Sequence, residues 1–504
     1  MATSERVLAS SDLGYDNSLD IFKIPVTNSG VTEIKYITHK PVNQFSSEGN
    51  VKFRLPGAGP SYVDLRDVYV RTLVRITRAD GTTLPKQPES LLVSSSTNSK
   101  TVGSTSSADG TSGTGGTGGT GSKTASSATG SAANSDSSTS TSTGTDKQNS
   151  DEGAWSVGPV NNLAHSLWDS VEVRLNDVVV LGGQTGYAYR SMINTLLDDN
   201  GGNDSDLECS MFVKDTAGSM NEATIRFASN VGFVERSRRM EGSRTVELMA
   251  KLDLDVFKVK KCLINGVTLD ICLTPTSHNF RLMTANISTT DYILEIQDIS
   301  LIVKQVLPSN PILVGHQEVM EKELSRARYF YIKEELRKFS LAKGTSSFYV
   351  EDAFNGKIPQ KMVIAFVAGD AMTGDIRSNP FNFKHYHINY INVSLSGNPT
   401  PRGPLTFDFN SGNYQQCYGD LYRGKTGTSD KRRITLSEYP EGYSLFVVDL
   451  APQNYDKYYP ANRDGNARIE LRFAKPLPES VVMLVRVSYP SLYEVDYARN
   501  IYLA

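Results

Sequence analysis

The 504-residue sequence contains few of the residues that build metal centres, disulfide frameworks and catalytic sites. There are four cysteines and six histidines. Cys209, Cys262, Cys272 and Cys417 have neither the spacing of a metal site nor the density of a disulfide scaffold. Cys262 and Cys272 flank a predicted turn and could lie close together, although reduced core thiols are the commoner outcome. The sequence therefore does not predict a fold held together by zinc or by disulfides.

Long apolar segments and clusters of positive charge are also missing. No stretch of eighteen apolar residues occurs, and residues 1–18 lack the apolar core of a signal peptide. We therefore expect a soluble protein that is made in the cytosol and is not inserted in a membrane. Lys+Arg total 52 against Asp+Glu 55, and the longest basic run is 431–433. Because sequence-independent grip on nucleic acid depends on clustered Lys and Arg, no specific nucleic-acid binding is predicted.

The sequence contains no His-Glu-x-x-His, no Gly-x-Ser-x-Gly and no Gly-x-Gly-x-x-Gly that follows a predicted strand. The best metal candidate is His385 with His387, two residues apart on a predicted strand and so on one face. No third ligand is evident, and structural histidines are the preferred interpretation. Asp198 and Asp199 lie in a polar loop, where solvated charge is the simpler interpretation. A carbohydrate-active enzyme stays open, because its two carboxylates would come from distant strands. The sequence identifies no catalytic, cofactor-binding or metal-binding residue.

The sequence is rich in short segments of alternating apolar and polar residues, which is typical of all-β proteins. The most informative stretch is 155–197. Val171, Val173 and Leu175 alternate with charged residues, and Asn176-Asp177 suits a tight hairpin into the strand that follows. After two glycines the apolar period becomes that of an amphipathic helix. The predicted unit is strand, tight turn, strand, helix.

The same order of elements recurs in the second half of the chain. A predicted strand over 389–395 ends at Gly397-Asn398, and helical spacing follows over 413–422. Further strands correspond in pairs: 246–254 with 444–450, 267–273 with 467–473, and 293–303 with 481–487. We infer two tandem β-rich domains with one plan, although their residue identity is low. The alternative is that two antiparallel domains share turn types by convergence.

The domain boundaries are predicted from Pro-rich breaks and from composition. Residues 1–50 are expected to be an N-terminal arm, 51–306 the first domain and 307–504 the second. Within the arm, residues 21–25 form a short apolar plug that could pack along its own domain or reach a neighbour.

Two segments of the first domain are predicted to be long loops. Residues 94–150 are almost wholly Ser, Thr, Gly and Ala. Such a segment cannot offset its ordering entropy by burial, so a flexible surface insert without a specific role is expected. Residues 198–241 resemble a long excursion of the kind that commonly carries contacts. After the boundary, a helix is predicted over 312–326 and a strand covered on both faces over 361–368.

Six short motifs occur in the order found in a known family. They are Tyr62-Val63-Asp64-Leu65, Gly158-Pro159-Val160-Asn161-Asn162, Tyr187-Ala188-Tyr189-Arg190, Asn265-Gly266-Val267, Asn379-Pro380-Phe381-Asn382-Phe383 and Glu494-Val495-Asp496-Tyr497-Ala498-Arg499. On these motifs the chain resembles the major capsid protein of Polinton (Maverick) elements and adintoviruses. The resemblance runs roughly from Ile21 to the end, apart from the insert.

The resemblance implies an all-β, hexon-like double jelly roll: two tandem eight-stranded antiparallel β-sandwiches with short helices in the loops. It implies homotrimers that act as pseudo-hexameric capsomers tiling an icosahedral shell. The implied partners are other copies of the chain, neighbouring capsomers, and penton or minor capsid proteins. The implied location is the virion, after synthesis in the host cytoplasm. No cofactor and no enzymatic activity are implied. The arm would lie inward, and the two long loops outward or between subunits.

Two other functions stay open at this point. A glycan-binding or glycan-cleaving β-sandwich protein would line one cleft with aromatic residues and carboxylates. A minor or vertex capsid protein usually carries one jelly roll, so the number of copies decides between it and a major capsid protein.

Overall fold

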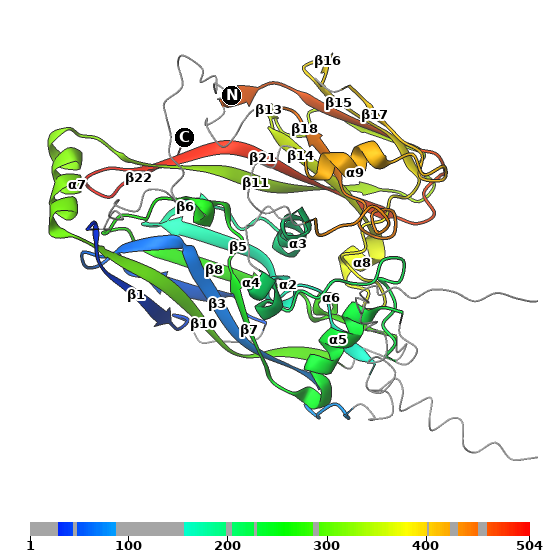
Figure 1. Ribbon diagram of the computed structural model, residues 1–504, viewed down its shortest axis with the longest axis horizontal. Helices are drawn as coiled ribbons and strands as arrows, with labels where there is room; N and C mark the ends of the chain where they lie inside the picture. The colour runs from blue at the N-terminus through cyan, green and yellow to red at the C-terminus, as the bar shows by residue number, and fades with distance from the viewer. Residues whose placement is uncertain are drawn as a thin grey trace, which may run out of the picture.

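The protein forms two β-sandwiches that lie side by side in the computed structural model (Figure 1). The structure describes residues 29–43, 48–86, 156–197, 204–225, 229–285, 292–400, 403–423, 432–451 and 461–503. The predicted insert and the predicted apolar plug, as well as Asp198 and Asp199, lie outside these residues.

The first sandwich pairs two four-stranded antiparallel sheets. One sheet has the order β1-β10-β3-β7, with bounds Val31–His39, Tyr292–Pro308, Tyr62–Arg78 and Val246–Lys251. The other has the order β2-β8-β5-β6, with bounds Val51–Leu55, Leu269–Pro275, Trp168–Leu175 and Val178–Leu181. A small sheet of β4 (Val157–Pro159) and β9 (Leu282–Thr284) lies beside them.

The second sandwich repeats this arrangement. One sheet has the order β11-β21-β14-β18, with bounds Ala327–Leu341, Val481–Val495, Lys361–Ala368 and Phe446–Asp449. The other has the order β12-β20-β15-β16, with bounds Ser347–Val350, Ala467–Phe473, Ile388–Leu395 and Asn398–Pro399. The marginal strands are β13 (Lys357–Ile358), β17 (Leu405–Thr406), β19 (Arg463–Asp464) and β22 (Ile501–Leu503).

The strands of the two sandwiches connect in the same order. When the eight main strands of each are numbered along the chain, one sheet is 1-8-3-6 and the other is 2-7-4-5 in both halves. This is the connectivity of a jelly roll, and the chain is a double jelly roll. The predicted duplication is confirmed, because unrelated domains that share turn types would not reproduce every crossover.

The hairpin predicted at Asn176-Asp177 is confirmed, and a second hairpin, which the sequence was not expected to form, occupies the corresponding position of the second half. Between β5 and β6, Asn176 and Asp177 have φ angles of 44° and 68°. Between β15 and β16, Ser396 and Gly397 have φ angles of 48° and 84°. A two-residue type I′ turn needs positive φ at both central residues, which Asn, Asp and Gly tolerate best. The turn chemistry thus set the register of both hairpins.

Short helices occupy the connections. Their bounds are α2 (Leu163–Ser166), α3 (Tyr187–Leu197), α4 (Asp204–Cys209), α5 (Val231–Arg239), η4 (Glu241–Ser243), η5 (Asp255–Lys258), α6 (His278–Arg281), α7 (Asn310–Lys322), α8 (Gly369–Thr373) and α9 (Gln415–Leu421). Figure 1 shows α7 at one end of the molecule, where it joins β10 to β11, and α3 between the sandwiches. Among the described residues, no helix combines the length and apolar character needed to cross a membrane.

Three sequence-based predictions need correction. Residues 31–39, expected within the arm, form β1 at the edge of a sheet. The alternation signal was missing because most β1 side chains are exposed on both faces. Residues 328–332 and 335–340, whose apolar patterns predict two separate strands, belong to one continuous strand, β11. The excursion over 198–241 is not wholly outward, since Met220 and Phe233 are buried in the core of the second sandwich.

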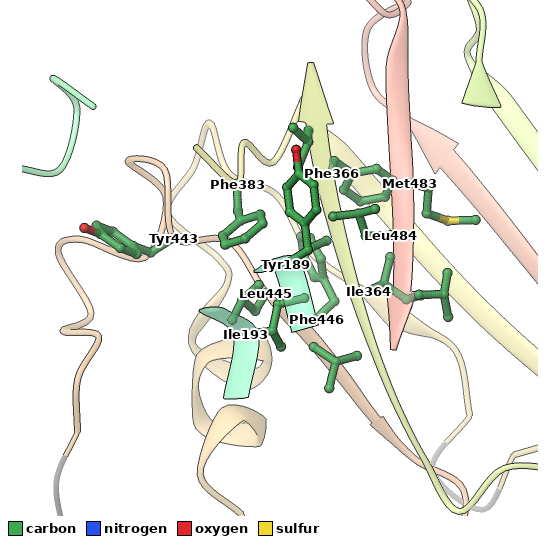
Figure 2. Close-up of a cluster of buried hydrophobic side chains, with 14 of the residues drawn as sticks. Tyr189, Ile193, Ile364, Phe366, Phe383, Tyr443, Leu445, Phe446, Met483 and Leu484 are labelled. Carbon is green, nitrogen blue, oxygen red and sulfur yellow. The ribbon is translucent and has the colours of Figure 1, made fainter. Parts of the chain in front are cut away.

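Each hydrophobic core takes side chains from both halves of the chain. The core of the second sandwich includes Tyr189 and Ile193 of α3, and that of the first includes Tyr329 and Tyr493. Figure 2 shows Tyr189 and Ile193 close to Phe383, Leu445 and Phe446 of the second sandwich. The predicted double coverage of β14 is confirmed, because its six central residues are all buried. The two sandwiches are therefore packed as one body.

Candidate functional site: the junction between the two sandwiches

The histidine pair does not occupy one face of a strand as predicted. His385 and His387 precede β15, and Tyr386 and His387 have positive φ angles of 46° and 52°. The His387 N–H donates to Nδ1 of His385 at 2.9 Å, and the His385 ring stacks on Phe409 with centroids 4.1 Å apart. Burial lowers the pKa of His385 to about 4. The ring positions are those of structural histidines.

The described residues contain no group of three or more His, Cys, Asp and Glu side chains placed to hold a metal ion. All four cysteines are among them, and none is bridged to another.

The main polar feature is a charged cluster between the sandwiches, here called the central ionic cluster, in which every member is buried except Lys258 at its exposed edge. Its members are Arg190, Asn194, Asp253, Asp255, Lys258, Glu334 and Arg486. They come from α3, the segment after β7, η5, β11 and β21. Three cations face three carboxylates, and five different elements meet at this one place.

Arg190 and Asn194 of α3 contact cluster members from the first half of the chain and from the second. The Arg190 guanidinium lies 3.2 Å from an Asp255 oxygen and donates to the Asp253 carbonyl at 2.6 Å. The Asn194 amide donates to the carboxylates of Asp253 and Glu334, each at 2.8 Å. Arg486 of β21 donates to the Asn194 side-chain oxygen. Both halves of the chain are therefore hydrogen-bonded through α3.

The remaining contacts join η5 to β11. The Glu334 N–H donates to an Asp255 oxygen at 2.7 Å. The Lys258 ammonium lies 2.9 Å from an Asp253 oxygen and 3.7 Å from a Glu334 oxygen. Lys258 thus pairs with a carboxylate from each sandwich.

The environment separates the pKa values of the three carboxyl groups. For each of the three groups, burial is the largest single influence on the pKa, and it acts to raise it. Lys258 and Arg190 nevertheless hold the pKa of Asp253 below its ordinary value, and Lys258 and Arg486 do the same for Glu334. For Asp255, burial outweighs the attraction of Arg190 and raises the pKa to about 6. The cluster therefore changes its charge in mildly acidic solution.

The arrangement favours a positioning role over a chemical one. A buried ion pair adds little net stability relative to apolar packing, but removing one partner leaves an uncompensated charge. Relative rotation of the sandwiches would separate the buried members of the cluster from partners that water cannot replace, whereas Lys258 is partly exposed. The cluster thus resists rotation of one jelly roll against the other.

A second polar contact between the sandwiches is centred on Asp215. Its carboxylate accepts from Arg236 at 2.7 Å, from Asn230 at 2.9 Å and from Asn379 at 3.2 Å. The hydroxyl of Tyr443 donates to the Asp215 carbonyl at 2.6 Å. Asn379 and Tyr443 belong to the second half of the chain, whereas Asp215 lies in the excursion. This excursion therefore serves as a tie between the sandwiches.

The helix α3 was predicted to be amphipathic, but all eleven of its residues are buried. Tyr187 enters the core of the first sandwich, the other apolar residues enter that of the second, and Arg190 and Asn194 enter the ionic cluster. Sequence reasoning missed the junction because a polar stripe is normally the solvent face of a helix.

The signal that could have found the junction is the set of six motifs. Three of the motifs supply contacts at the centre of the junction: Gly158–Asn162, Tyr187–Arg190 and Asn379–Phe383. Arg236 donates to the Pro159 carbonyl at 3.1 Å, Arg190 lies in the ionic cluster, and the Asn379 amide donates to the Asp215 carboxylate. The other three lie nearer α7. Tyr62 contacts His316, and Arg499 donates to the Asn265 carbonyl at 2.7 Å.

Comparison with known proteins places this fold among viral proteins. No protein-family model matches the sequence. An uncharacterised protein of Caenorhabditis elegans, F54H12.2, is 22% identical over 349 residues, which cover 68% of this chain and 80% of that protein.

Solved viral structures match nearly the whole chain. A chain from the cryo-electron microscopy structure of the Sputnik virophage has a TM-score of 0.58 at 12% identity, covering 100% of this chain and 94% of that one. VP54 of PBCV-1 has a TM-score of 0.52 at 8% identity, with 96% and 99% covered. A chain of the PBCV-1 capsid has a TM-score of 0.51 at 9% identity, with 96% and 99% covered. The chain therefore has the double jelly-roll fold of virophage and giant-virus capsid proteins.

Proposed function

We propose that the chain is a major capsid protein whose homotrimers act as pseudo-hexameric capsomers of an icosahedral shell. The observation that carries this proposal is the identical connectivity of two jelly rolls within one chain. Three copies related by a threefold axis present six similar wedges, so their outline is nearly hexagonal and can tile a facet through repeated lateral contacts. Each copy then works through its surfaces and not through an active site.

The rigid junction supports the proposal. A tile keeps its shape only if the angle between its two wedges is the same in every copy. The shared cores, the central ionic cluster and the Asp215 contacts all restrict that angle. A protein that only binds a small ligand in one sandwich has no need of so much buried contact with the other.

The duplication also favours a major over a minor or vertex capsid protein, since those usually carry one jelly roll. The location would be the virion, reached after synthesis in the host cytoplasm. The partners would be other copies of the chain, adjoining capsomers, and penton or minor capsid proteins.

The finer lineage, a capsid protein of Polinton elements or adintoviruses, is supported by two observations. The six motifs that carry the resemblance supply contacts at the junction or near α7, where substitutions would disturb the assembly unit. A relative also occurs in the genome of an animal, the nematode C. elegans.

Size-exclusion chromatography with light scattering tests the oligomer. We expect a species of three times the 55.2 kDa chain mass, and negative-stain images with hexagonal outlines. A strictly monomeric protein at micromolar concentration would refute the proposal.

A further inference from the structure

A groove lies beside α7, at the end of the molecule where the two sandwiches are joined. It has a volume of about 880 Å³. Tyr62, Ile264, Val319, Met320 and Tyr329 supply much of its wall. The site described above does not include this groove.

The apolar side chains around the groove are partly open to solvent. Val319 is 42% exposed, and Leu324 is 81% exposed at a backbone φ of 51°. Leucine rarely adopts positive φ, and it seldom exposes so much of its side chain next to other apolar groups. These two features indicate a surface that is covered in the working protein.

The rim of the groove carries an excess of positive charge. Arg326 and Arg328 both pair with Glu494, at 3.0 and 2.9 Å, and Lys261 lines the same groove. The lining thus holds three cations, two of which share the single carboxylate of Glu494. An occupant with an apolar core and an acidic flank would suit this surface.

The sequence just ahead of the described chain contains such a segment. Residues 21–26 read Ile-Phe-Lys-Ile-Pro-Val, and Asp12, Asp16 and Asp20 precede them. The described chain begins at residue 29, and the Ser309 N–H donates to the Gly30 carbonyl at 3.0 Å. Gly30 therefore lies at the start of α7, the helix that forms one wall.

The distances permit the contact within one chain. Four extended residues reach up to about 14 Å, which is the span available between Val26 and Gly30. The helix rises about 10 Å between Ser309 and His316, at 1.5 Å per residue. The apolar segment can therefore lie along α7 without coming from another copy.

We propose that residues 21–26 dock in the groove beside α7 of their own chain, with the acidic residues before them facing Arg326, Arg328 and Lys261. The segment would cover Val319 and Leu324 and tie residues ahead of β1 to the connection between the sandwiches. This contact does not depend on the proposed capsid role.

A disulfide trap in the full chain tests the contact, because native Cys262 also lines the groove. In an Ile24→Cys variant, mild oxidation should join the introduced thiol to Cys262 within one chain, as shown by peptide mapping and a monomeric band on a non-reducing gel. Burial raises the pKa of Cys262, so the oxidation is run in alkaline buffer. The matched control, Ser11→Cys, should give no such bridge. Absence of the Ile24→Cys bridge, or a bridge between chains, would overturn the proposal.

Hydrogen exchange supplies a second readout that needs no cysteine. Deleting residues 2–26 should increase amide exchange at 316–328 several-fold and leave β20 unchanged. A Phe22→Asp variant of the full chain should have the same effect. Unchanged exchange at 316–328 in both variants would show that the segment does not cover the groove.

Discussion

Replacing Arg190 with methionine tests whether the central ionic cluster joins the sandwiches. Methionine keeps much of the side-chain length but removes the charge that faces Asp255 at 3.2 Å and the donor to the Asp253 carbonyl. Arg190 is 7% exposed, so water cannot replace it. Breaking a buried ion pair by removing one partner costs about 3–5 kcal/mol. We expect a loss of unfolding free energy in that range at pH 8.

The expected loss depends on pH because of Asp255. Its pKa is raised from 3.8 to about 6, so the folded protein holds this proton more tightly than the unfolded chain does. The Asp255 contribution therefore lowers stability as pH rises through this window. Without Arg190 the pKa of Asp255 should rise further. We expect Arg190→Met to cost less at pH 5 than at pH 8.

The measurement is the midpoint of urea unfolding, followed by circular dichroism and by fluorescence at one fixed protein concentration. Arg472→Met is the matched control, because Arg472 pairs with Glu470 on the surface with its side chain 59% exposed. That change should leave the unfolding midpoint within experimental error of the wild type. Asp255→Asn in the Arg190→Met background should recover part of the loss. A loss below about 1 kcal/mol, or strict additivity of the two substitutions, would refute the coupling.

Two further predictions concern packing and assembly. Ile193→Ala should lower the free energy of unfolding by about 2–5 kcal/mol, because it leaves a cavity in the core of the second sandwich although the residue belongs to the first half of the chain. An unfolding midpoint within error of the wild type would contradict the shared core. Ile34 and Tyr36 are 53% and 59% exposed on β1, at the edge of its sheet, and we expect their joint replacement by Asp to reduce the trimer fraction in light scattering. The control for that experiment is Val231→Asp, an apolar site on α5 that is 66% exposed. A trimer fraction that the double replacement on β1 leaves unchanged would show that β1 is not an intersubunit surface.

Local patterns were sufficient to predict much of the sheet structure. Alternation in Val171, Val173 and Leu175 marked β5, and Asn176-Asp177 marked the turn that follows. These signals are short-range, because a strand has a period of two residues and a type I′ turn needs only two residues with positive φ. Their recurrence in the second half was visible without coordinates.

Local patterns failed where a residue's partner is distant in the chain. Asn194 and Arg486 are 292 positions apart, yet their side chains are hydrogen-bonded. Glu334 lies in the gap between the two predicted strands, 328–332 and 335–340, whereas in the structure it belongs to β11 and is held by Asn194 and Lys258. No local period distinguishes such a residue from one that faces water.

The sequence by itself determined that this protein is a duplicated β-sandwich, because strand and turn preferences act between near neighbours and are written twice along the chain. Only the tertiary structure decided how the two sandwiches are joined, that α3 is buried on every side, and that β1 completes a sheet. These features depend on burial and on charge pairing between segments that meet only after folding. The angle between the two jelly rolls, on which the proposed assembly depends, is therefore a property of the folded chain.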